Sequence, residues 1–480
     1  MAEQPMLKFV KIARDMPEKR AAEVRREDFG EIYAEYAEAK AQEQSSRCSQ
    51  CGVPYCQTHC PLHNNIPDWL RLTAEGRLRE AYEVSQATNT FPEICGRICP
   101  QDRLCEGNCV IEQSGHGTVT IGSVEKYITD TAWEQGWVQP ITPSAERTES
   151  VGIIGAGPGG LAAADVLRRA GVQVTVYDRY DRAGGLLTYG IPGFKLEKDV
   201  VMRRNDQLDA GGVTFKLNCA VGDDISFQEI RDAHDAVIIA TGVYKSRDLS
   251  MPNGEVTGIE KAIDFLTASN RKSFGDAVPD FDSGRLNAEG KRVVVIGGGD
   301  TAMDCVRTSI RQGATSVKCL YRRDRANMPG SQREVQNAEE EGVVFEWLSA
   351  PKGFTTDGAK VAGVMVQKMR LGAPDATGRQ APEVIEGADY VEEADLVIKA
   401  LGFEPEALPT LWDQPELEVT RWGTVKAEFT TGKTALDGVY AVGDIVRGAS
   451  LVVWAIRDGR DCAEAILETM NAKAQVMAAE

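Results

Sequence analysis

The sequence predicts an α/β protein in which two Rossmann-like folds are joined to an N-terminal, mainly helical domain. Three features predict this: strands and helices alternate from residue 151 onward, two glycine-rich turns each lie between a strand and a helix, and eight of the twelve cysteines fall between Cys48 and Cys109. Regular strand–helix alternation is typical of parallel sheets covered by helices. The cysteine-rich segment precedes that alternation and is expected to form a domain of its own.

Length and composition agree with several globular domains. At ~150 residues per domain, 480 residues correspond to about three domains. A content of 42% hydrophobic and 26% charged residues excludes a disordered chain. The longest apolar runs, 293–296 and 451–456, are far shorter than the ~20 residues of a membrane span. The charged N-terminus lacks an apolar core of signal-peptide length, which predicts a cytoplasmic protein.

The charge balance narrows the expected partners. A net charge of −18, from 72 acidic and 54 basic residues, argues against nucleic acid and anionic membranes. It is compatible with an enzyme, or with a subunit that docks on a basic surface. Because nothing in the sequence indicates export, clustered cysteines point to a bound metal rather than to disulfides.

The N-terminal part is predicted to be an arm followed by helices. The arm belongs to residues 1–47 and leads into a charged helix at 26–44. Further helices are expected at 66–75, 78–88 and 122–134, and a linker rich in proline and polar residues follows at 139–150.

From residue 151 the predicted elements alternate. The first unit has strands at 151–154, 172–177 and 236–239, a helix at 161–170, and then a looser stretch at 246–290. The second unit has strands at 291–296 and 316–321 and a helix at 301–312. Antiparallel strands are expected at 341–347 and 360–369, further strands at 396–400 and 439–442, and a final helix at 449–470.

The first glycine-rich turn, residues 155–160, has the dinucleotide-binding pattern GxGxxG. Gly155 permits the tight turn, Gly157 lets the backbone approach a pyrophosphate, and Gly160 lets the helix and strand pack closely. The free N–H groups at the start of the helix favour phosphate binding. Asp178 closes the next strand, where a carboxylate can bind a ribose diol. The alternative is a purely structural glycine turn.

The second glycine-rich turn, residues 297–302, matches the GxGxxA variant through Gly297, Gly299 and the following Asp300 and Thr301. No acid closes its second strand. Arg322 and Arg323 stand there instead, and arginines can pair with a 2′-phosphate through forked hydrogen bonds. This predicts NADP rather than NAD at the second site. The alternative is a solvated basic loop.

Two dinucleotide sites on one chain indicate hydride transfer from a nicotinamide to a flavin. The flavin is assigned to the first site because Asp178 suits an unphosphorylated ribose. With Thr241-Gly242 after a strand and Gly443-Asp444 near the C-terminus, the two turns resemble the two-dinucleotide-binding flavoprotein superfamily. The resemblance implies that an NADP domain is inserted into an FAD domain, and that Asp444 contacts the ribityl or pyrophosphate part of FAD. Hydride transfer itself requires no acid or base, so no catalytic side chain is assigned.

The clustered cysteines have the spacing of metal ligands. Two groups of four are present, Cys48-x2-Cys51-x4-Cys56-x3-Cys60 and Cys95-x3-Cys99-x5-Cys105-x3-Cys109. Thiolates favour iron–sulfur clusters or zinc, so two 4Fe-4S clusters or two zinc ions would account for them. A flavin on the same chain favours clusters, which can carry single electrons away from it.

Residues 28–125 also resemble one family closely, through the motifs at 47–52, 60–62, 64–67 and 99–100. These look like the N-terminal cluster domain of the small (β) subunits of NADPH-dependent glutamate synthases, a module that dihydropyrimidine dehydrogenase shares. The resemblance continues through 184–192, which contains Gly185 and Leu186, and covers nearly the whole chain.

The resemblance implies that each cluster takes ligands from both cysteine groups. One cluster would be held by Cys48, Cys51, Cys56 and Cys109. The other would be held by Cys60, Cys99 and Cys105, with a side-chain oxygen as its fourth ligand. Dehydrogenase relatives have glutamine at that position, whereas this chain has Glu125, so Cys95 competes as an alternative ligand.

The resemblance also implies a function and a domain plan. Residues 1–145 would bind the clusters, 146–258 with 403–480 would bind FAD, and 259–402 would bind NADPH. Electrons from NADPH would pass through FAD and two 4Fe-4S clusters to a large (α) subunit that makes glutamate from glutamine and 2-oxoglutarate, in a hetero-oligomer. The alternatives are a stand-alone NADPH:ferredoxin-type oxidoreductase and a zinc-stabilised adaptor without turnover.

Overall fold

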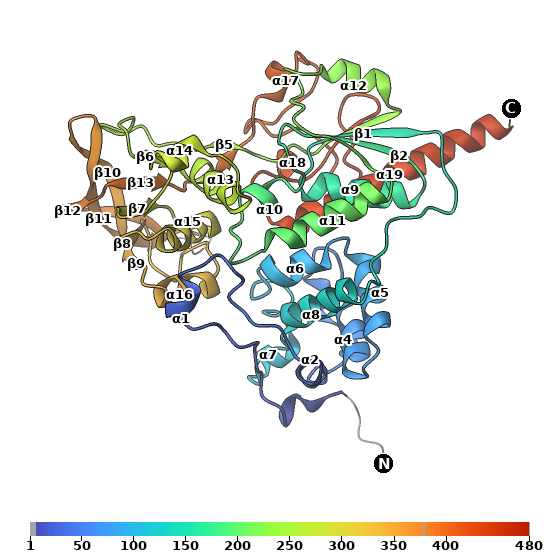
Figure 1. Ribbon diagram of the computed structural model, residues 1–480, viewed down its shortest axis with the longest axis horizontal. Helices are drawn as coiled ribbons and strands as arrows, with labels where there is room; N and C mark the ends of the chain where they lie inside the picture. Colours follow the sequence, from blue (N-terminus) through green and yellow to red (C-terminus); the bar gives the residue numbers. More distant parts are fainter. Residues whose placement is uncertain (1–5, 377, 379, 480) are drawn as a thin grey trace.

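The computed structural model describes residues 6–376, 378 and 380–479. Figure 1 shows a helical N-terminal part next to two α/β parts, one carrying the long C-terminal helix and the other a protruding antiparallel sheet. This arrangement confirms the predicted fold class. The first five residues of the predicted arm lie outside the described residues.

The first α/β unit is built on a five-stranded parallel sheet in the order β15-β4-β1-β2-β3. Its strands are β1 (Ser150–Ile154), β2 (Gln173–Tyr177), β3 (Thr214–Lys216), β4 (Ala236–Ile239) and β15 (Val439–Ala441). The last strand comes from near the end of the chain and completes one edge of the sheet. Its helices are α9 (Pro158–Arg169), α10 (Leu186–Tyr189), α11 (Lys198–Ala210), α12 (Phe227–Ala233), α17 (Leu408–Leu411), α18 (Asp444–Arg447) and α19 (Val452–Ala479).

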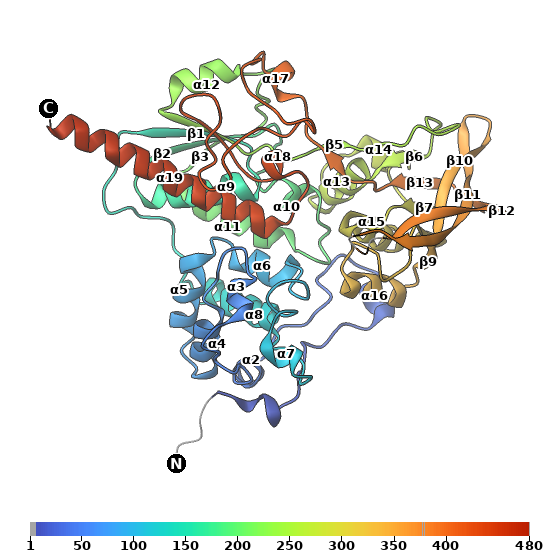
Figure 2. The same ribbon diagram turned by 180° about the vertical axis from the view of Figure 1, so that it is seen from behind.

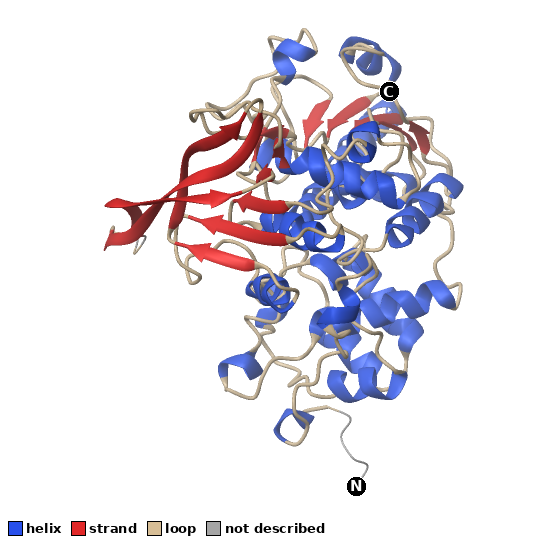
Figure 3. Cartoon of the chain, turned by 60° about the vertical axis from the view of Figure 1, so that its left-hand side comes forward, coloured by secondary structure: helices blue, strands red, loops and turns tan. Residues whose placement is uncertain are grey.

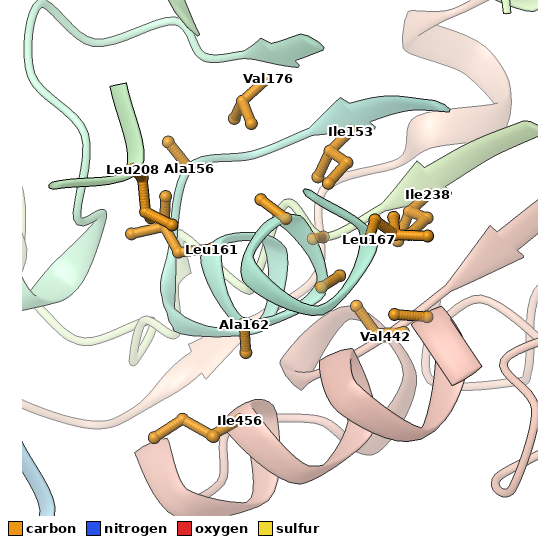
Figure 4. Packing of buried hydrophobic residues seen from close by; sticks show 14 of the residues in the cluster. Ile153, Ala156, Leu161, Ala162, Leu167, Val176, Leu208, Ile238, Val442 and Ile456 are labelled. Carbon is orange, nitrogen blue, oxygen red and sulfur yellow. The ribbon is translucent and has the colours of Figure 1, made fainter. Parts of the chain in front are cut away.

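The core of this unit lies between the sheet and helices α9 and α19. The inward side chains of the central strands, such as Ile153 and Ile238, are fully buried. Figure 4 shows them over Leu161 and Leu167 of α9, with Ile456 of α19 on the other side of that helix. Burial on both faces explains why the strands of a parallel sheet are continuous apolar runs.

The second unit has a parallel sheet in the order β6-β13-β7-β8-β9. Its strands are β6 (Ile259–Lys261), β7 (Arg292–Ile296), β8 (Ser316–Tyr321), β9 (Val344–Trp347) and β13 (Leu396–Lys399), and its helices are α13 (Ala262–Ser273), α14 (Pro279–Asp282), α15 (Asp300–Arg311) and α16 (Gln332–Glu340). The chain enters and leaves this unit beside the antiparallel pair β5 (Lys245–Ser246) and β14 (Phe403–Glu404). The second unit is therefore an insertion in the first.

A three-stranded antiparallel sheet covers one face of the second unit. It consists of β10 (Ser349–Asp357), β11 (Lys360–Pro374) and β12 (Gln380–Glu393), and Figure 3 shows it projecting from the body of the protein. Phe354 and Val364 of this sheet pack on Val294 and Leu320 of the parallel sheet.

The N-terminal part is a bundle of short helices. They are η1 (Lys8–Val10), α1 (Ala22–Arg25), α2 (Glu38–Ser45), α3 (Tyr55–Thr58), α4 (Ile66–Ala74), α5 (Leu78–Thr88), α6 (Pro92–Ile98), α7 (Val110–Gln113) and α8 (Ile121–Glu134). Trp69 of α4 and Val124 and Ile128 of α8 are fully buried in its core. Across the described ranges of the chain, no helix has the length and apolar character needed to cross a membrane.

Three expectations from the sequence are wrong. The charged helix predicted at 26–44 begins only at Glu38, because residues 26–37 form turns and loop whose Glu31 carboxylate binds Arg97 and Lys126. The strand at 344–347 is parallel to β8 and not antiparallel. The stretch at 246–290 is not loose throughout, since it contains the twelve-residue helix α13.

Candidate functional site

A single cavity of about 480 Å³ joins all three parts of the protein. Its wall contains Gly155 and Gly157 of the first glycine turn, Asp300 and Thr301 at the start of α15, and the segment around Cys99 of the helical part. Both predicted dinucleotide turns and part of the cysteine-rich region therefore face one space. The sequence predicted each of these features but not their convergence.

The glycines of the first turn meet different spatial demands. A Cβ on Gly155, whose φ is +111°, would lie 2.4 Å from the carbonyl oxygen of Ala240, and one on Gly160 would lie 2.1 Å from the carbonyl oxygen of Gly155. A Cβ on Gly157 would meet no atom of the described residues within 4 Å. Gly155 thus allows the first turn to lie close to the backbone after β4, and Gly160 allows α9 to pack on β1 and the turn, whereas Gly157 leaves open the approach to the N-terminus of α9.

Asp178 lies beside this turn, at the end of β2. Its carboxylate accepts hydrogen bonds from the backbone N–H of Ala156 (2.7 Å) and of Tyr180 (2.8 Å). The side chain is buried, and burial raises the pKa of its carboxyl group above the usual value. These two hydrogen bonds hold the carboxylate beside the first turn, as the predicted ribose-binding role requires.

The other residues predicted for the first site also reach this cavity. Thr241, Gly242, Gly443, Asp444 and Leu186 line its wall, and burial raises the pKa of Asp444 to about 6. Among the described residues, the buried hydroxyl of Thr241 has no hydrogen-bond partner, as expected for a group that awaits a ligand. Gly185 lies behind the wall, where its Cβ would come within 3.0 Å of the Cα of Gly157.

A cluster of aromatic and charged side chains beside Asp178 was not predicted. The guanidinium of Arg179 donates to both carboxylate oxygens of Glu406 (2.9 and 3.1 Å) and lies 4.8 Å from the ring centroid of Tyr244. All three residues line the cavity. Only the position of Arg179 directly after Asp178, the predicted ribose-binding acid, could have drawn attention to it.

The second turn has the same design as the first. A Cβ on Gly297, at φ +147°, would lie 2.2 Å from the carbonyl oxygen of Ala400, whereas Gly299 has open space around it in the described structure. Asp300 fixes the neighbouring loop, since its Oδ1 accepts from the N–H of Ser331 at 2.9 Å. Asp300 and Thr301 line the shared cavity.

The two predicted phosphate-binding arginines lie away from the shared cavity wall. They follow β8, at the edge of the second turn, where Arg322 is exposed and Arg323 is half-buried. Within the described part of the chain, the buried Nε of Arg323 lacks a hydrogen-bond partner. An unpaired guanidinium nitrogen beside a glycine turn is suited to an anionic group such as a 2′-phosphate.

Four cysteines form a first group in space. Burial, together with the charges of Cys48, Cys109 and Cys51, raises the pKa of the Cys56 thiol to about 12. Burial likewise raises the pKa of Cys48 to about 11, and Cys109 and Cys51 contribute. Residues from both cysteine-rich segments of the sequence therefore lie together, and their soft sulfur donors suit an iron–sulfur cluster.

A second group gathers around Cys99. Burial raises the thiol pKa of Cys99 well above its usual value, and the charges of Cys60 and Glu125 add to the effect. Burial also raises the pKa of Cys105, with contributions from Cys99, Cys60 and Glu125. Cys95 is buried beside the same residues. Both candidates for the fourth ligand are thus next to the three predicted cysteines.

Glu125 is a buried acid held by two amides. Its Oε1 accepts from Nδ2 of Asn64 (2.9 Å) and of Asn89 (3.2 Å), and burial raises its pKa to about 8. All twelve cysteines are free thiols. Across the described residues, no three His, Cys, Asp or Glu side chains are already arranged around a metal position. The fit to clusters therefore rests on the donor types and on their grouping.

Comparisons with known protein families divide the chain at the same place as the structure. Residues 25–137 match the family model described as dihydropyrimidine dehydrogenase domain II, 4Fe-4S cluster. Residues 149–459 match the model described as pyridine nucleotide-disulphide oxidoreductase. The first match covers the helical part, and the second covers most of both α/β units.

Individual relatives match the chain along its whole length. It is 66% identical over 475 residues to the glutamate synthase (NADPH) small chain of Azospirillum brasilense, covering 99% of this chain and 98% of that one. The corresponding protein of Escherichia coli K12 is 46% identical over 474 residues, covering 98% and 99% of the two chains.

One solved structure shares the fold of the α/β units. It is that of Mycobacterium tuberculosis FprA in complex with NADPH, with a TM-score of 0.58, 21% identity, and coverage of 69% of this chain and 86% of that one. At this identity the likeness concerns the fold alone.

Proposed function

Because the chain belongs to the family of glutamate synthase (NADPH) small chains, we propose that it is the NADPH-oxidising flavoprotein subunit of such an enzyme. Electrons would pass from NADPH through FAD and two 4Fe-4S clusters to a large subunit that makes glutamate from glutamine and 2-oxoglutarate. The observation that supports the proposal best is the shared cavity, which residues of both glycine turns and the segment around Cys99 line.

The proposal assigns each cofactor to one part of the chain. Residues 1–145 hold the clusters, residues 146–258 with 403–480 hold FAD, and residues 259–402 bind NADPH. For FAD the residues are Gly155, Gly157, Gly160, Asp178, Gly185, Leu186, Thr241, Gly242, Gly443 and Asp444. For NADPH they are Gly297, Gly299, Asp300, Thr301, Arg322 and Arg323. The unpaired Thr241 hydroxyl and Arg323 Nε support these two assignments.

The two cysteine groups would hold the two clusters. The first has Cys48, Cys51, Cys56 and Cys109 as ligands, and the second has Cys60, Cys99, Cys105 and Glu125. When bound, FAD accepts hydride from NADPH, and the clusters carry the electrons away singly. Cys95 and Cys99 line the shared cavity, which supports an order in which the second group takes electrons from FAD and the first passes them to the acceptor.

The chain's own residues bind and orient the reactants. Leu186 and Ile191, after the first glycine turn, give the cavity an apolar wall that excludes water from the transferred hydride. Further support for a partner comes from the net charge of −18, which favours docking on a basic surface. We place the resulting hetero-oligomer in the cytoplasm.

We expect the purified holoprotein to oxidise NADPH with an artificial acceptor but to make no glutamate on its own. The physical reason is that the described cofactor sites account for electron transfer, while no site for amide hydrolysis is assigned. The measurement is glutamate formation from NADPH, glutamine and 2-oxoglutarate, with and without the large subunit of a related enzyme. Glutamate made from glutamine by this chain alone would contradict the subunit role. Failure of the large subunit to restore synthesis would favour the ferredoxin-type alternative.

The assignment of NADP to the second turn predicts a change in nucleotide preference. Replacing Arg322 and Arg323 by alanine should weaken NADPH use and leave NADH use nearly unchanged. Each charge-assisted contact that is lost costs about 1.5–3 kcal/mol, or roughly ten- to a hundredfold in kcat/KM. Steady-state kinetics with both nucleotides provide the measurement. The matched control is Arg325→Ala, because that arginine already pairs with Glu339 at 2.8 Å. Equal losses with NADPH and NADH would remove the two arginines from the phosphate site.

A further inference from the structure

A segment of the N-terminal part, residues 17–36, reaches the inserted unit through its short helix α1, and we call it the strap. It folds back on itself through hydrogen bonds from the N–H of Arg20 to the carbonyl of Ile32 and from the N–H of Ala34 to the carbonyl of Glu18, both 2.9 Å. Its short helix α1 lies beside α16, as both Figure 1 and Figure 2 show, away from the bundle to which the strap is connected.

The tip of the strap ends in a buried ionic junction with the inserted unit. Nε of Arg25 donates to Oε1 of Glu341 at 2.9 Å, and the same carboxylate accepts from Nη2 of Arg307 (2.8 Å) and from Nη1 of Arg311 (2.6 Å). Arg25 and Glu341 are each 1% exposed. Nη2 of Arg25 also donates to Glu340 at 2.7 Å. Three guanidinium groups fix the orientation of one buried carboxylate, and water cannot take the place of a guanidinium group there.

The same arginines hold a segment of the flavin-binding unit. The guanidinium carbons of Arg307 and Arg311 lie 4.3 and 4.0 Å from the ring centroid of Phe194, which is 1% exposed. Phe29 of the strap contacts the same ring, with a centroid distance of 6.3 Å to Phe194. The adjacent Lys195 donates to Asp304 of α15 at 2.9 Å.

The base of the strap is fixed as well. The carboxylate of Glu31 binds Arg97 of α6 and Lys126 of α8. Tyr33 lines both the shared cavity and a second cavity of about 170 Å³ between the strap and α8. The strap thus touches all three parts of the protein and contributes a residue to the cofactor cavity itself.

From these contacts we propose that the strap positions α15 and α16, which bear Asp300, Thr301 and the cavity wall, against the flavin-side segment 186–195. Arg25 is the principal positioning residue, and Phe29 assists it. The proposal rests on the proposed function, since it concerns the alignment of NADPH with FAD. Hydride transfer requires the reacting atoms to be about 3–3.5 Å apart, so a shift of ~1 Å between the units slows it by up to ~100-fold.

The test uses the holoprotein with Arg25→Ala. Stopped-flow measurement of flavin reduction at saturating NADPH should show a rate about 10- to 100-fold lower. The dissociation constant for NADP⁺ should stay within about twofold, because the strap touches none of the residues assigned to the nucleotide, and FAD and iron contents should be unchanged. Arg26→Ala is the matched control, since the neighbouring arginine is exposed and pairs only with Glu27 among the pairs described. Arg25→Lys should recover part of the rate, because lysine restores the positive charge but not the forked N–H donors of a guanidinium group.

Other outcomes of this experiment would overturn the role proposed for the strap or the proposed function. A reduction rate for Arg25→Ala equal to that of Arg26→Ala would overturn the proposal. A fall in rate that only parallels a loss of bound FAD would also overturn the proposal, because the strap would then stabilise the fold and would not align the two units. If Arg25→Ala does not fold, Phe29→Ala tests the strap through its separate contact with Phe194 and should slow flavin reduction at unchanged NADP⁺ affinity. An unaltered protein that fails to oxidise NADPH would refute the proposed function, not the strap.

Discussion

Replacing Gly160 by alanine is expected to destabilise the first α/β unit by about 3 kcal/mol and, with FAD at its proposed site there, to abolish FAD binding. The new Cβ would lie 2.1 Å from the carbonyl oxygen of Gly155 and 3.1 Å from Cγ2 of Ile153. The first of these contacts is with backbone, so α9 would have to move away from β1 and disturb the buried core shown in Figure 4. Thermal unfolding of the apoprotein and the flavin content of the purified variant provide the measurements.

Gly157→Ala is the matched control and separates packing from ligand binding. Gly157 has a φ of −80°, and its Cβ would meet no described atom within 4 Å. The apoprotein should therefore lose only about 1 kcal/mol or less, the cost of alanine at a helix N-cap. FAD binding should still be lost, because the methyl group occupies the approach of the pyrophosphate. A Gly157→Ala variant that retains its flavin would show that the first turn is not the FAD site.

The regular elements could be predicted because their signals are local. The strand before each glycine turn and the helix after it follow from apolar periodicity and from glycines whose positive φ no other residue adopts easily. The strap could not be predicted in the same way. Its charged residues favour a helix by themselves, but Glu31, inside the predicted helix, is paired with Arg97 and Lys126, which lie 66 and 95 positions later in the chain. Such long-range partners override local propensity.

The candidate site shows the same division between local and long-range information. The glycines and Asp178, the predicted ribose-binding acid, stood out from their spacing, and the cysteine sets were proposed from a family resemblance. Lys195 and Glu406 carried no local signal, because only the folded chain brings them to the cavity. The parallel pairing of β9 with β8 was also hidden, since alternation in a strand does not reveal its neighbour.

Removing Glu125, the proposed fourth ligand of the second cysteine group, is expected to cost the protein one of the two proposed clusters. Glu125→Ala should lower the iron and sulfide contents by about half and remove one of two reduced-cluster signals in electron paramagnetic resonance. FAD should stay bound, because Glu125 does not line the shared cavity. Cluster ligation also contributes to folding, so the helical part should unfold more easily. Electron flow from NADPH to the large subunit should then fall to background.

The comparison with Cys95→Ser decides which side chain serves as that ligand. Cys95 lies beside the same cysteines as Glu125, but its Sγ also contacts Oδ1 of Asn89 at 3.9 Å. We expect Cys95→Ser to keep both clusters, and Glu125→Gln to keep the second cluster because an amide oxygen can replace a carboxylate oxygen. Loss of a cluster in Cys95→Ser, with normal iron in Glu125→Ala, would reverse the assignment. A metal analysis that finds zinc in place of iron would instead favour the zinc-stabilised alternative for this part of the chain.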